Sequence, residues 1–254
     1  MRHGWLDHPR PVAIAHRGGS LENDENTMPA FAHAVALGYR HLETDVHLTA
    51  DGAVVIHHDA TLERLTGDPR PIAALTLRDL ATVRTHAGAE IPQLADLLEE
   101  YPDAFVNIEA KSDAVVAPLA ALLVRMGALD RIGTGSFDIT RTARLRAVLG
   151  SGLCWSPAYR GVLGLWLGGW GLPLPHAGFP MVQVPRAFRG IPVVTPRFVR
   201  AAHRRGIRVQ VWTVDDAASM HALLDMGVDG LMTDRPTLLK QVLQARGEWR
   251  NGNA

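Results

Sequence analysis

Two short runs rich in strand-forming residues carry acidic side chains at alternate positions. Glu43 and Asp45 are two residues apart, so in a β-strand they lie on the same face. Glu109 and Lys111 have the same spacing in the second run, and Asn107 shares their face. Three carboxylates in one apolar interior repel each other and raise their own pKa values unless a cation neutralises them. The pattern therefore indicates a site for one divalent cation, Mg²⁺ or Ca²⁺, because both ions prefer oxygen ligands.

The same residues have a structural interpretation. The three acids could form ordinary buried ion pairs with two nearby cations, Arg17 and Lys111. Acidic side chains at the strand ends of a barrel more often belong to a site, which favours the metal. Zinc is disfavoured, because it would require more histidine ligands and the chain has no His-x-His strand motif.

Two of the twelve histidines stand beside these acids at the ends of predicted strands. His16 follows the first strand and His58 follows the second. Two histidines can act as general base and general acid around a phosphodiester. His57 is a rival for the second position, since parity puts His58 on the face of Val54 and Ile56 and His57 on the opposite face. The alternation of side chains along a strand does not by itself decide between His57 and His58.

Strand-like and helix-like runs alternate along the chain, which is typical of βαβ units in a parallel sheet. The predicted strands are 12–15, 41–48 with 54–58, 105–110, 131–137, 153–156, 181–184, 208–214 and 230–233. The predicted helices are 28–37, 114–126, 140–149, 196–205, 217–226 and 237–244. Several of these helices stop at a glycine, namely Gly38, Gly127, Gly150, Gly206 and Gly227. We expect an α/β fold with a single domain over residues 1–254, a (β/α)8 TIM barrel with a small insertion after strand 2.

One apolar segment makes the predicted barrel irregular near the fifth crossover. Residues 161–185 contain no Asp, Glu, Lys or Arg, and they include Trp166, Leu167 and Trp170. A membrane-spanning helix needs roughly 20 apolar residues in helical form, whereas Pro173, Pro175, Pro180 and six glycines break this run. We expect an apolar loop or short helix over one end of the barrel, and no transmembrane segment. A transient membrane contact through residues 161–185 stays open.

Composition limits the class of partner. The 26 Lys and Arg residues balance the 26 Asp and Glu residues, so the net charge gives no argument for binding nucleic acid. The lone Cys154 excludes a disulfide within the chain and fits a reducing compartment. The N-terminus has no apolar signal segment. We expect a cytoplasmic protein that acts on a small molecule, and the oligomeric state stays open.

Several separated motifs occur in the order found in one enzyme family. They are His16-Arg17-Gly18-Gly19, Glu25-Asn26-Thr27, Glu43-x-Asp45, His58-Asp59, Glu109-x-Lys111, Val211-Trp212-Thr213-Val214, Gly227-Val228-Asp229-Gly230 and Thr233-Asp234-Arg235-Pro236. With these motifs the chain resembles the glycerophosphodiester phosphodiesterase family. Two features depart from that family: Asp24 replaces the usual proline before Glu25, and residues 161–185 match none of its motifs. Neither departure removes a group that the chemistry of the family needs.

The resemblance implies a role for each site residue. It implies a metal-binding set of carboxylates: Glu43, Asp45 and Glu109. It implies an acid–base pair, His16 and His58, and so selects His58 over His57. It places four residues around the substrate and its phosphate: Arg17, Lys111, Asn26 and Trp212. Glu25 and Asn26 are expected to support or orient these groups. For Trp212, packing in the barrel core is an equal alternative.

The activity implied by the resemblance is metal-dependent hydrolysis of glycerophosphodiesters to sn-glycerol 3-phosphate and an alcohol. One alternative is lysophospholipase D-type cleavage of lysophospholipids at the same site, with Trp166 and Trp170 beside an acyl chain. A second is a non-catalytic barrel that binds a phosphoryl ligand, which is disfavoured because no expected acid, histidine or cation is missing. The sequence assigns base and acid to neither histidine, and does not choose between attack by water and a cyclic intermediate.

Overall fold

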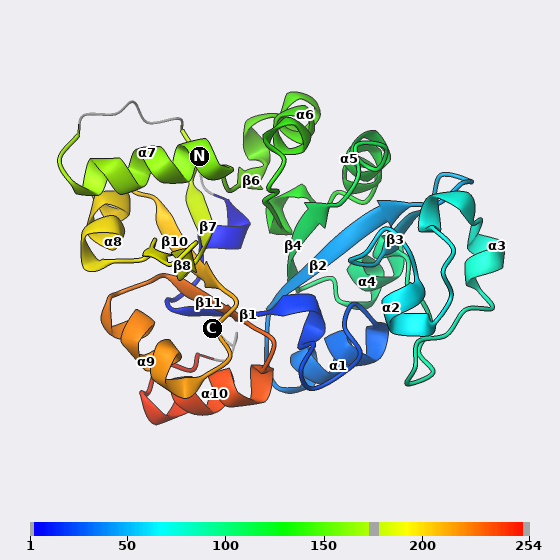
Figure 1. Cartoon of the computed structure of the whole chain (residues 1–254), viewed down its shortest axis with the longest axis horizontal. Coiled ribbons are helices and arrows are strands. Elements are labelled where there is room, and N and C mark those ends of the chain that lie inside the picture. The colour runs from blue at the N-terminus through cyan, green and yellow to red at the C-terminus, as the bar shows by residue number, and fades with distance from the viewer. Residues whose placement is uncertain (1–2, 173–177, 251–254) are drawn as a thin grey trace.

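Parallel strands alternate with helices around a barrel in the computed structural model, which describes residues 3–172 and 178–250 (Figure 1). The strands are β1 (Val12–Ala15), β2 (His41–Leu48), β3 (Val54–Ile56), β4 (Phe105–Ala110), β5 (Ile132–Thr134), β6 (Cys154–Trp155), β7 (Met181–Pro185), β8 (Ala187–Phe188), β9 (Ile191–Pro192), β10 (Arg208–Trp212) and β11 (Gly230–Thr233). The helices are α1 (Met28–Ala36), α2 (Glu63–Thr66), α3 (Leu77–Leu80), α4 (Leu94–Glu100), α5 (Val116–Arg125), α6 (Ile139–Leu149), α7 (Tyr159–Gly169), α8 (Pro196–His203), α9 (Ala217–Asp225) and α10 (Pro236–Ala245). Short 3-10 helices are η1 (Gly4–Leu6), η2 (His16–Gly18), η3 (Ile72–Ala74), η4 (Leu129–Arg131) and η5 (Gly150–Gly152).

Eight parallel strands form the barrel, in the order β6-β5-β4-β2-β1-β11-β10-β7, and β3 pairs antiparallel with β2. Backbone pairing is interrupted between β6 and β7. There the Gln183 N–H of β7 donates to the Ser156 hydroxyl, which follows β6, at 2.8 Å. The barrel is therefore nearly closed, and the predicted (β/α)8 architecture is confirmed.

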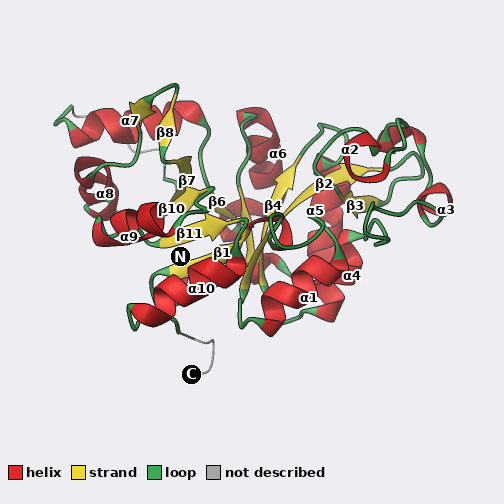
Figure 2. Ribbon diagram, turned by 60° about the horizontal axis from the view of Figure 1, so that its bottom comes forward, coloured by secondary structure: helices red, strands yellow, loops and turns green. Residues whose placement is uncertain are grey.

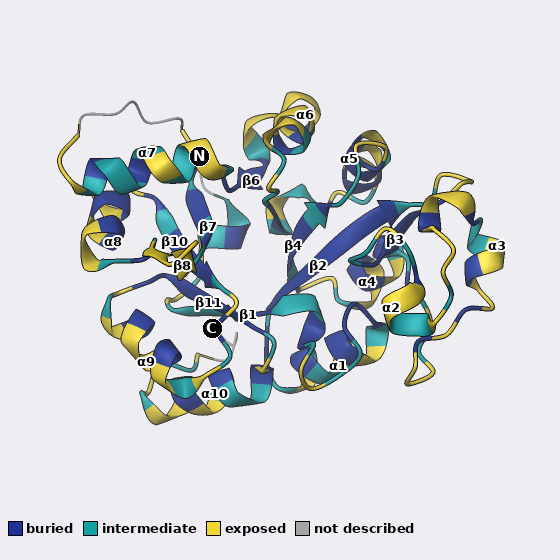
Figure 3. Cartoon of the chain, in the orientation of Figure 1, coloured by how far each residue is buried: buried dark blue, intermediate teal, exposed yellow. Residues whose placement is uncertain are grey.

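The central strands are buried on both faces, as expected for a parallel sheet covered by helices. In β2 every residue except the last is buried (Figure 3). Leu42 and Val46 of β2, with Val106 and Ile108 of β4, are fully buried in the core that packs against the helices. The opposite face of these two strands carries Glu43, Asp45, Asn107 and Glu109, which point into the barrel. The predicted alternation of faces is confirmed.

Local signals set the ends of the helices. Thr27, Asp138, Thr195 and Asp216 cap α1, α6, α8 and α9, each through a side-chain oxygen that accepts a backbone N–H of the first turn. The glycines that were expected to end helices lie just after α1, α5, α6, α8 and α9. The six predicted helices consequently match the observed bounds to within two residues.

The insertion after the second barrel strand is confirmed and has a core of its own. It spans residues 49–91 and contains β3, α2, η3 and α3, which lie together at one side of the barrel (Figure 1). Its core consists of Val55, Leu62, Ile72, Leu75, Leu80 and Val83. Helix α4 follows it and buries Leu94, Leu97 and Leu98. The sequence analysis does not predict α4, because seven residues are too short to show a helical period clearly.

The apolar segment begins with α7, which packs against α8, and the β8–β9 hairpin follows β7. Figure 2 shows α7 and the hairpin beyond the carboxyl ends of the strands. The expected short helix is thus observed for residues 161–169, whereas residues 173–177 lie outside the described residues. Within the two described ranges, no helix combines the length and apolar character needed to cross a membrane.

The N-terminal segment closes the opposite end of the barrel. Trp5, in η1, is fully buried and packs with Ile14, Cys154, Met181 and Met232 inside the barrel. Cys154 is a buried free thiol, as expected, and burial raises its pKa. The burial of Trp5 is not predicted by the sequence.

The turn after β1 generates a testable prediction about stability. Gly18 has φ +80°, and a Cβ atom there would lie 2.7 Å from Ala30 Cβ and 2.9 Å from the Ala30 carbonyl carbon. Gly18→Ala therefore adds a clash with α1 to backbone strain, and we expect it to lower the free energy of unfolding by about 2–4 kcal/mol. Gly52→Ala is the matched control, because Gly52 has φ +86° and no atom within 4 Å of the added Cβ. It should cost about 1 kcal/mol in urea unfolding, and equal losses in the two variants would contradict the steric argument.

Candidate active site

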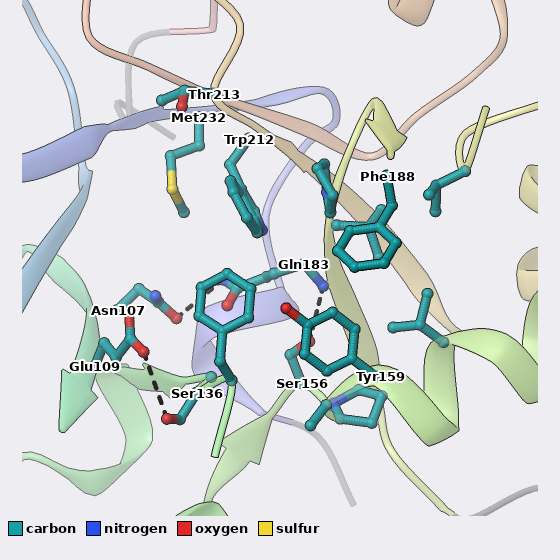
Figure 4. Close-up of a pocket in the computed structure, with 18 of the residues that line it drawn as sticks. Asn107, Glu109, Ser136, Ser156, Tyr159, Gln183, Phe188, Trp212, Thr213 and Met232 are labelled. Atoms are coloured by element: carbon teal, nitrogen blue, oxygen red, sulfur yellow. Dashed lines mark hydrogen bonds between the residues drawn. The ribbon is translucent and has the colours of Figure 1, made fainter. Parts of the chain in front are cut away.

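The register between β2 and β4 brings the predicted acids together. Glu43 pairs with Asn107 and Asp45 with Glu109, so their side chains share the interior face. All four line one cavity of about 520 Å³ at the carboxyl ends of the strands. Figure 4 shows Asn107 and Glu109 at one side of this cavity, with Ser136 donating to Glu109 at 3.4 Å. The sequence thus placed three carboxylates correctly on a common wall.

The charge of these carboxylates is only partly compensated by protein cations. Lys111 Nζ lies 3.4 Å from Asp45 and 3.3 Å from Glu109, and Arg17 Nε lies 3.2 Å from Asp45. Glu43 is buried, and burial together with the neighbouring Asp45 raises its pKa to about 8. Glu43 therefore binds a proton more readily than an exposed glutamate does.

The loop after β1 adopts left-handed backbone conformations that direct donors at the acids. Arg17 has φ +51°, a conformation that is unfavourable for a residue with a side chain. In this conformation the Arg17 N–H donates to Glu43 at 3.1 Å, and its carbonyl accepts the Asn26 N–H. The Asn26 side chain donates to Asp45 at 3.0 Å and accepts from Thr44 at 2.8 Å. Asn26 is buried behind the acids, where it orients Asp45.

Both predicted histidines line the cavity, and each is held by a carboxylate through Nδ1. His16 Nδ1 lies 2.6 Å from Asp234, and His58 Nδ1 lies 2.6 Å from Asp59. Burial alone would lower the pKa of His16, but the Glu43 and Asp234 carboxylates outweigh it and the pKa is raised. A carboxylate on Nδ1 leaves Nε2 as the ring nitrogen for other contacts, and in His16 this atom lies 3.7 Å from Glu43. Asp59 and Asp234 stand within motifs of the sequence, but their contacts with the histidines are not predictable from it.

His57 lies away from the cavity. It is buried, and its Nε2 lies 3.1 Å from the Thr61 carbonyl oxygen. Burial lowers the pKa of His57. The structure therefore places His58, and not its neighbour, beside the acids.

An arginine of the insertion links two carboxylates of the site, Glu25 beside Arg17 and Asp59 beside His58. Arg64, in α2, donates to both oxygens of Glu25 at 2.7 and 3.0 Å, and its Nε donates to Asp59. Glu25 also accepts from Arg17 at 3.0 Å. Although burial acts in the opposite direction, the hydrogen bonds from Arg64 and His58 lower the pKa of Asp59 to about 2. Glu25 has the supporting position expected of it, whereas Arg64 was missed because nothing local distinguishes it from a surface arginine.

The other side of the cavity is lined by amides and aromatic rings. Gln183 Nε2 donates to Asn107 at 2.9 Å and to Gln210 at 3.0 Å across the barrel interior. Trp212 lines the cavity, and its ring centroid lies 5.5 Å from that of Phe137. Tyr159 lies 5.7 Å from Phe137 and 5.3 Å from Phe188, again between ring centroids. Figure 4 shows Trp212, Tyr159 and Phe188 around the same space.

The chemistry of the acids suits a divalent cation, although their present contacts are with protein cations. Glu43, Asp45 and Glu109 offer carboxylate oxygens on one wall, which Mg²⁺ and Ca²⁺ prefer. Burial and the neighbouring Asp45 both raise the pKa of Glu43, and a bound cation would act in the opposite direction. Across the described residues, no three or more His, Cys, Asp or Glu side chains are arranged as a metal site, and Asp45 and Glu109 contact Lys111. The ion pairs of the structural interpretation are therefore present for Asp45 and Glu109, whereas Glu43 lies 3.7 Å from His16.

Known proteins share both this sequence and this fold. The chain matches the pattern of the Glycerophosphoryl diester phosphodiesterase family over residues 16–149 and 166–238. It is 40% identical to the "Probable glycerophosphodiester phosphodiesterase 2" of Mycobacterium tuberculosis, over 96% of this chain and 95% of that protein. It is 28% identical to lysophospholipase D GDPD1 of Rattus norvegicus, over 91% and 85% of the two chains.

A solved structure supports the same fold. The crystal structure of a glycerophosphodiester phosphodiesterase from Agrobacterium tumefaciens superposes with a TM-score of 0.77 at 24% identity, over 91% of this chain and 99% of that one. At that identity the likeness concerns the fold alone. Because the family pattern and the mycobacterial relative cover most of the sequence, the chain belongs to the glycerophosphoryl diester phosphodiesterase family of enzymes, as its motifs indicated.

Proposed function

We propose that the protein hydrolyses glycerophosphodiesters to sn-glycerol 3-phosphate and an alcohol. The observation that carries the proposal is the pair of carboxylate-held histidines, which lie in one cavity with Arg17, Lys111 and three acids. Acid–base groups and phosphate-binding cations on a common wall are what cleavage of a phosphodiester needs.

The roles of the residues follow from their positions. Arg17 and Lys111 face the cavity and would bind phosphate oxygens, Arg17 through its planar fork and Lys111 as a point charge. One histidine takes the proton of the attacking hydroxyl through Nε2, and the other gives a proton to the departing alkoxide. Asp59 and Asp234 keep each ring in the orientation that leaves Nε2 toward the substrate.

We further propose that the activity depends on one divalent cation, Mg²⁺ or Ca²⁺, held by Glu43, Asp45 and Glu109. When bound, the cation would neutralise phosphate charge and lower the energy of the charged transition state. Its positive charge would also keep Glu43 ionised at neutral pH, since burial and Asp45 otherwise raise the pKa of Glu43.

A second candidate function is lysophospholipase D-type cleavage, in which the departing alcohol carries an acyl chain. The observation that favours it is the apolar side of the cavity, where Val162, Leu163 and Trp166 of α7 meet Phe188 and Val193. Such a wall offers contact to a hydrocarbon chain and nothing to a small polar alcohol. The lysophospholipase D of Rattus norvegicus, similar to this chain along most of its length, supports the same candidate.

The main prediction concerns the histidines and the metal. Release of sn-glycerol 3-phosphate from glycerophosphocholine should require Mg²⁺ or Ca²⁺ and stop in EDTA. His16→Ala and His58→Ala should each lower kcat by about 10²–10⁴-fold, because a general acid or base is lost, and Glu43→Ala should remove metal-dependent turnover. His33→Ala is the control, since His33 is a partly exposed partner of Glu22 outside the cavity. Full activity in EDTA would refute the metal, and tight metal binding without turnover of any diester would favour a binding protein.

A second prediction tests Arg64 as a positioning residue. Arg64→Gln should lower kcat about 10- to 100-fold with a smaller change in KM, because Glu25 and Asp59 lose their common partner while the phosphate-binding groups remain. Arg64→Lys should recover only part of this loss, since an ammonium cannot donate to both carboxylates as a fork. Arg70→Gln is the matched control: Arg70 belongs to the same insertion and pairs with Asp68. Equal kinetic effects at Arg64 and Arg70 would assign both to the stability of the insertion.

A third prediction separates the two candidate substrates. Val162→Phe fills part of the apolar side of the cavity, so it should reduce turnover of lysophosphatidylcholine by roughly 10-fold or more and leave glycerophosphocholine nearly unchanged. Val148→Phe, on an exposed face of α6, is the control. If Val162→Phe affects both substrates equally, the apolar side does not contact an acyl chain.

A further inference from the structure

The charges of the chain are divided very unevenly along the sequence. Between Asp138 and Asp215 there is no Asp or Glu, although eleven arginines occur there. The rest of the chain holds all 26 acids and only fifteen basic residues. The zero net charge therefore conceals a strongly basic lobe, which contains α6, α7, α8 and the β8–β9 hairpin.

Exposed apolar side chains gather in nearly the same part of the molecule. The described residues include eleven large hydrophobic side chains that are exposed, and nine of these are Phe137, Ile139, Val148, Tyr159, Leu163, Trp170, Leu172, Phe188 and Ile191. Figure 3 shows exposed positions near the start of α7 and at β8, in contrast to the buried strands of the barrel. An exposed cluster of this kind marks an interaction surface more often than chance exposure does.

The helix and the hairpin form one continuous face. Trp166 Nε1 of α7 donates to the Pro192 carbonyl of β9 at 3.1 Å. Tyr159 at the start of α7 lies 5.3 Å from Phe188 of β8, between ring centroids. Both rings also line the cavity, so this face leads directly into the site. Figure 2 places α7 and the hairpin on the same side of the molecule, beyond the strand ends.

Arginines on this face have no acidic partners. Within the described part of the chain, Arg160, Arg189 and Arg197 are exposed and form no ion pair. Arg197 lies over the Trp170 ring, with 4.4 Å from its guanidinium carbon to the ring centroid. By contrast, three of the four arginines of the insertion, Arg64, Arg70 and Arg84, each pair with an acid. The positive charge of the face is therefore available to an outside anion.

We propose that this apolar-basic face, formed by Tyr159, Leu163, Trp170, Phe188 and Ile191 with Arg160, Arg189 and Arg197, docks the protein on the surface of an anionic lipid membrane. Aromatic and aliphatic side chains would enter the headgroup region while the arginines contact lipid phosphates. The cavity mouth then faces the membrane, and a lipid substrate would reach the histidines without crossing water. Docking on the membrane does not depend on the proposed function. Only the entry of a lipid substrate from the membrane into the cavity rests on that function.

The charge pattern favours a membrane over other occupants. A second copy of this chain would bring the same basic face against itself, and Arg160, Arg189 and Arg197, which form no ion pair within the described residues, would repel their own copies. The described residues expose tryptophan and tyrosine beside arginine on the face, the combination found where proteins meet a bilayer interface.

Vesicle co-sedimentation tests the proposal without any turnover. The full chain should bind vesicles of phosphatidylcholine with about 30% phosphatidylglycerol at least roughly 10-fold more strongly than phosphatidylcholine alone. Binding should weaken strongly in about 0.5 M NaCl, because salt screens exposed charges. Arg189→Gln/Arg197→Gln should weaken binding by about 10-fold, and Trp170→Ser should weaken it on anionic vesicles as well. None of these three residues lines the cavity, so hydrolysis of glycerophosphocholine should be unchanged.

Matched controls use the same substitutions elsewhere. Arg78→Gln/Arg125→Gln removes two exposed arginines outside the face, and Val124→Ser removes an exposed apolar side chain of α5. The proposal is overturned if the protein binds neither vesicle, if binding ignores lipid charge and salt, or if the controls weaken binding as much. Self-association that Arg189→Gln/Arg197→Gln abolishes, without vesicle binding, would instead make the face an interface between copies. Because sedimentation needs no catalysis, failure of membrane docking and failure of the phosphodiesterase proposal remain distinguishable.

Discussion

Asp45 and Glu109 are direct partners in the parallel register of β2 and β4, and the site is arranged around this pairing. Both carboxylates point into the barrel, with Glu43 beside them on the same face, where burial makes their negative charge costly. The protein places Arg17 and Lys111 against these acids from the ends of β1 and β4. The backbone of Arg17 accepts an unfavourable left-handed conformation at the same point, and its N–H meets Glu43. Strain in the loop and charge in the strands are thus parts of one arrangement.

A series of ion pairs leads from Arg17 outward to the insertion, and it explains why the insertion lies beside the site. Glu25 offsets Arg17, Arg64 offsets Glu25 and Asp59, and Asp59 holds the ring of His58. Glu25 is buried, and Arg17 and Asp59 are partly buried, so the loss of exposed Arg64 would leave Glu25 and Asp59 without one of their partners. The insertion carries its own apolar core, which gives α2 a stable base from which its arginine reaches the barrel. Arg64, a cation from outside the barrel, thereby joins Glu25 and Arg17 to Asp59 and His58.

Local signals made much of this molecule predictable from sequence, and distant contacts account for the rest. Parity along a strand placed Glu43 and Asp45 on the interior face, and caps and glycines marked helix ends to within two residues. Trp5 was not predictable, because a three-residue 3-10 helix has no period and its burial depends on strands far along the chain. Arg64 was missed for a similar reason: its two acids become neighbours only after folding. The β8–β9 hairpin, with two residues in each strand, is too short to show alternation.

The cavity is assembled from two parts of the chain that meet different physical demands. The charged wall comes from strands within residues 16–149, which match the family pattern, and its ions must keep hydrogen-bonding distances to act at all. Tyr159, Val162 and Leu163 of the opposite wall lie in the interval 150–165, which that pattern does not cover. An apolar wall needs only suitable volume and exclusion of water, so it tolerates replacement of one hydrophobic side chain by another. The apolar wall therefore constrains the identity of its residues less than the charged wall does.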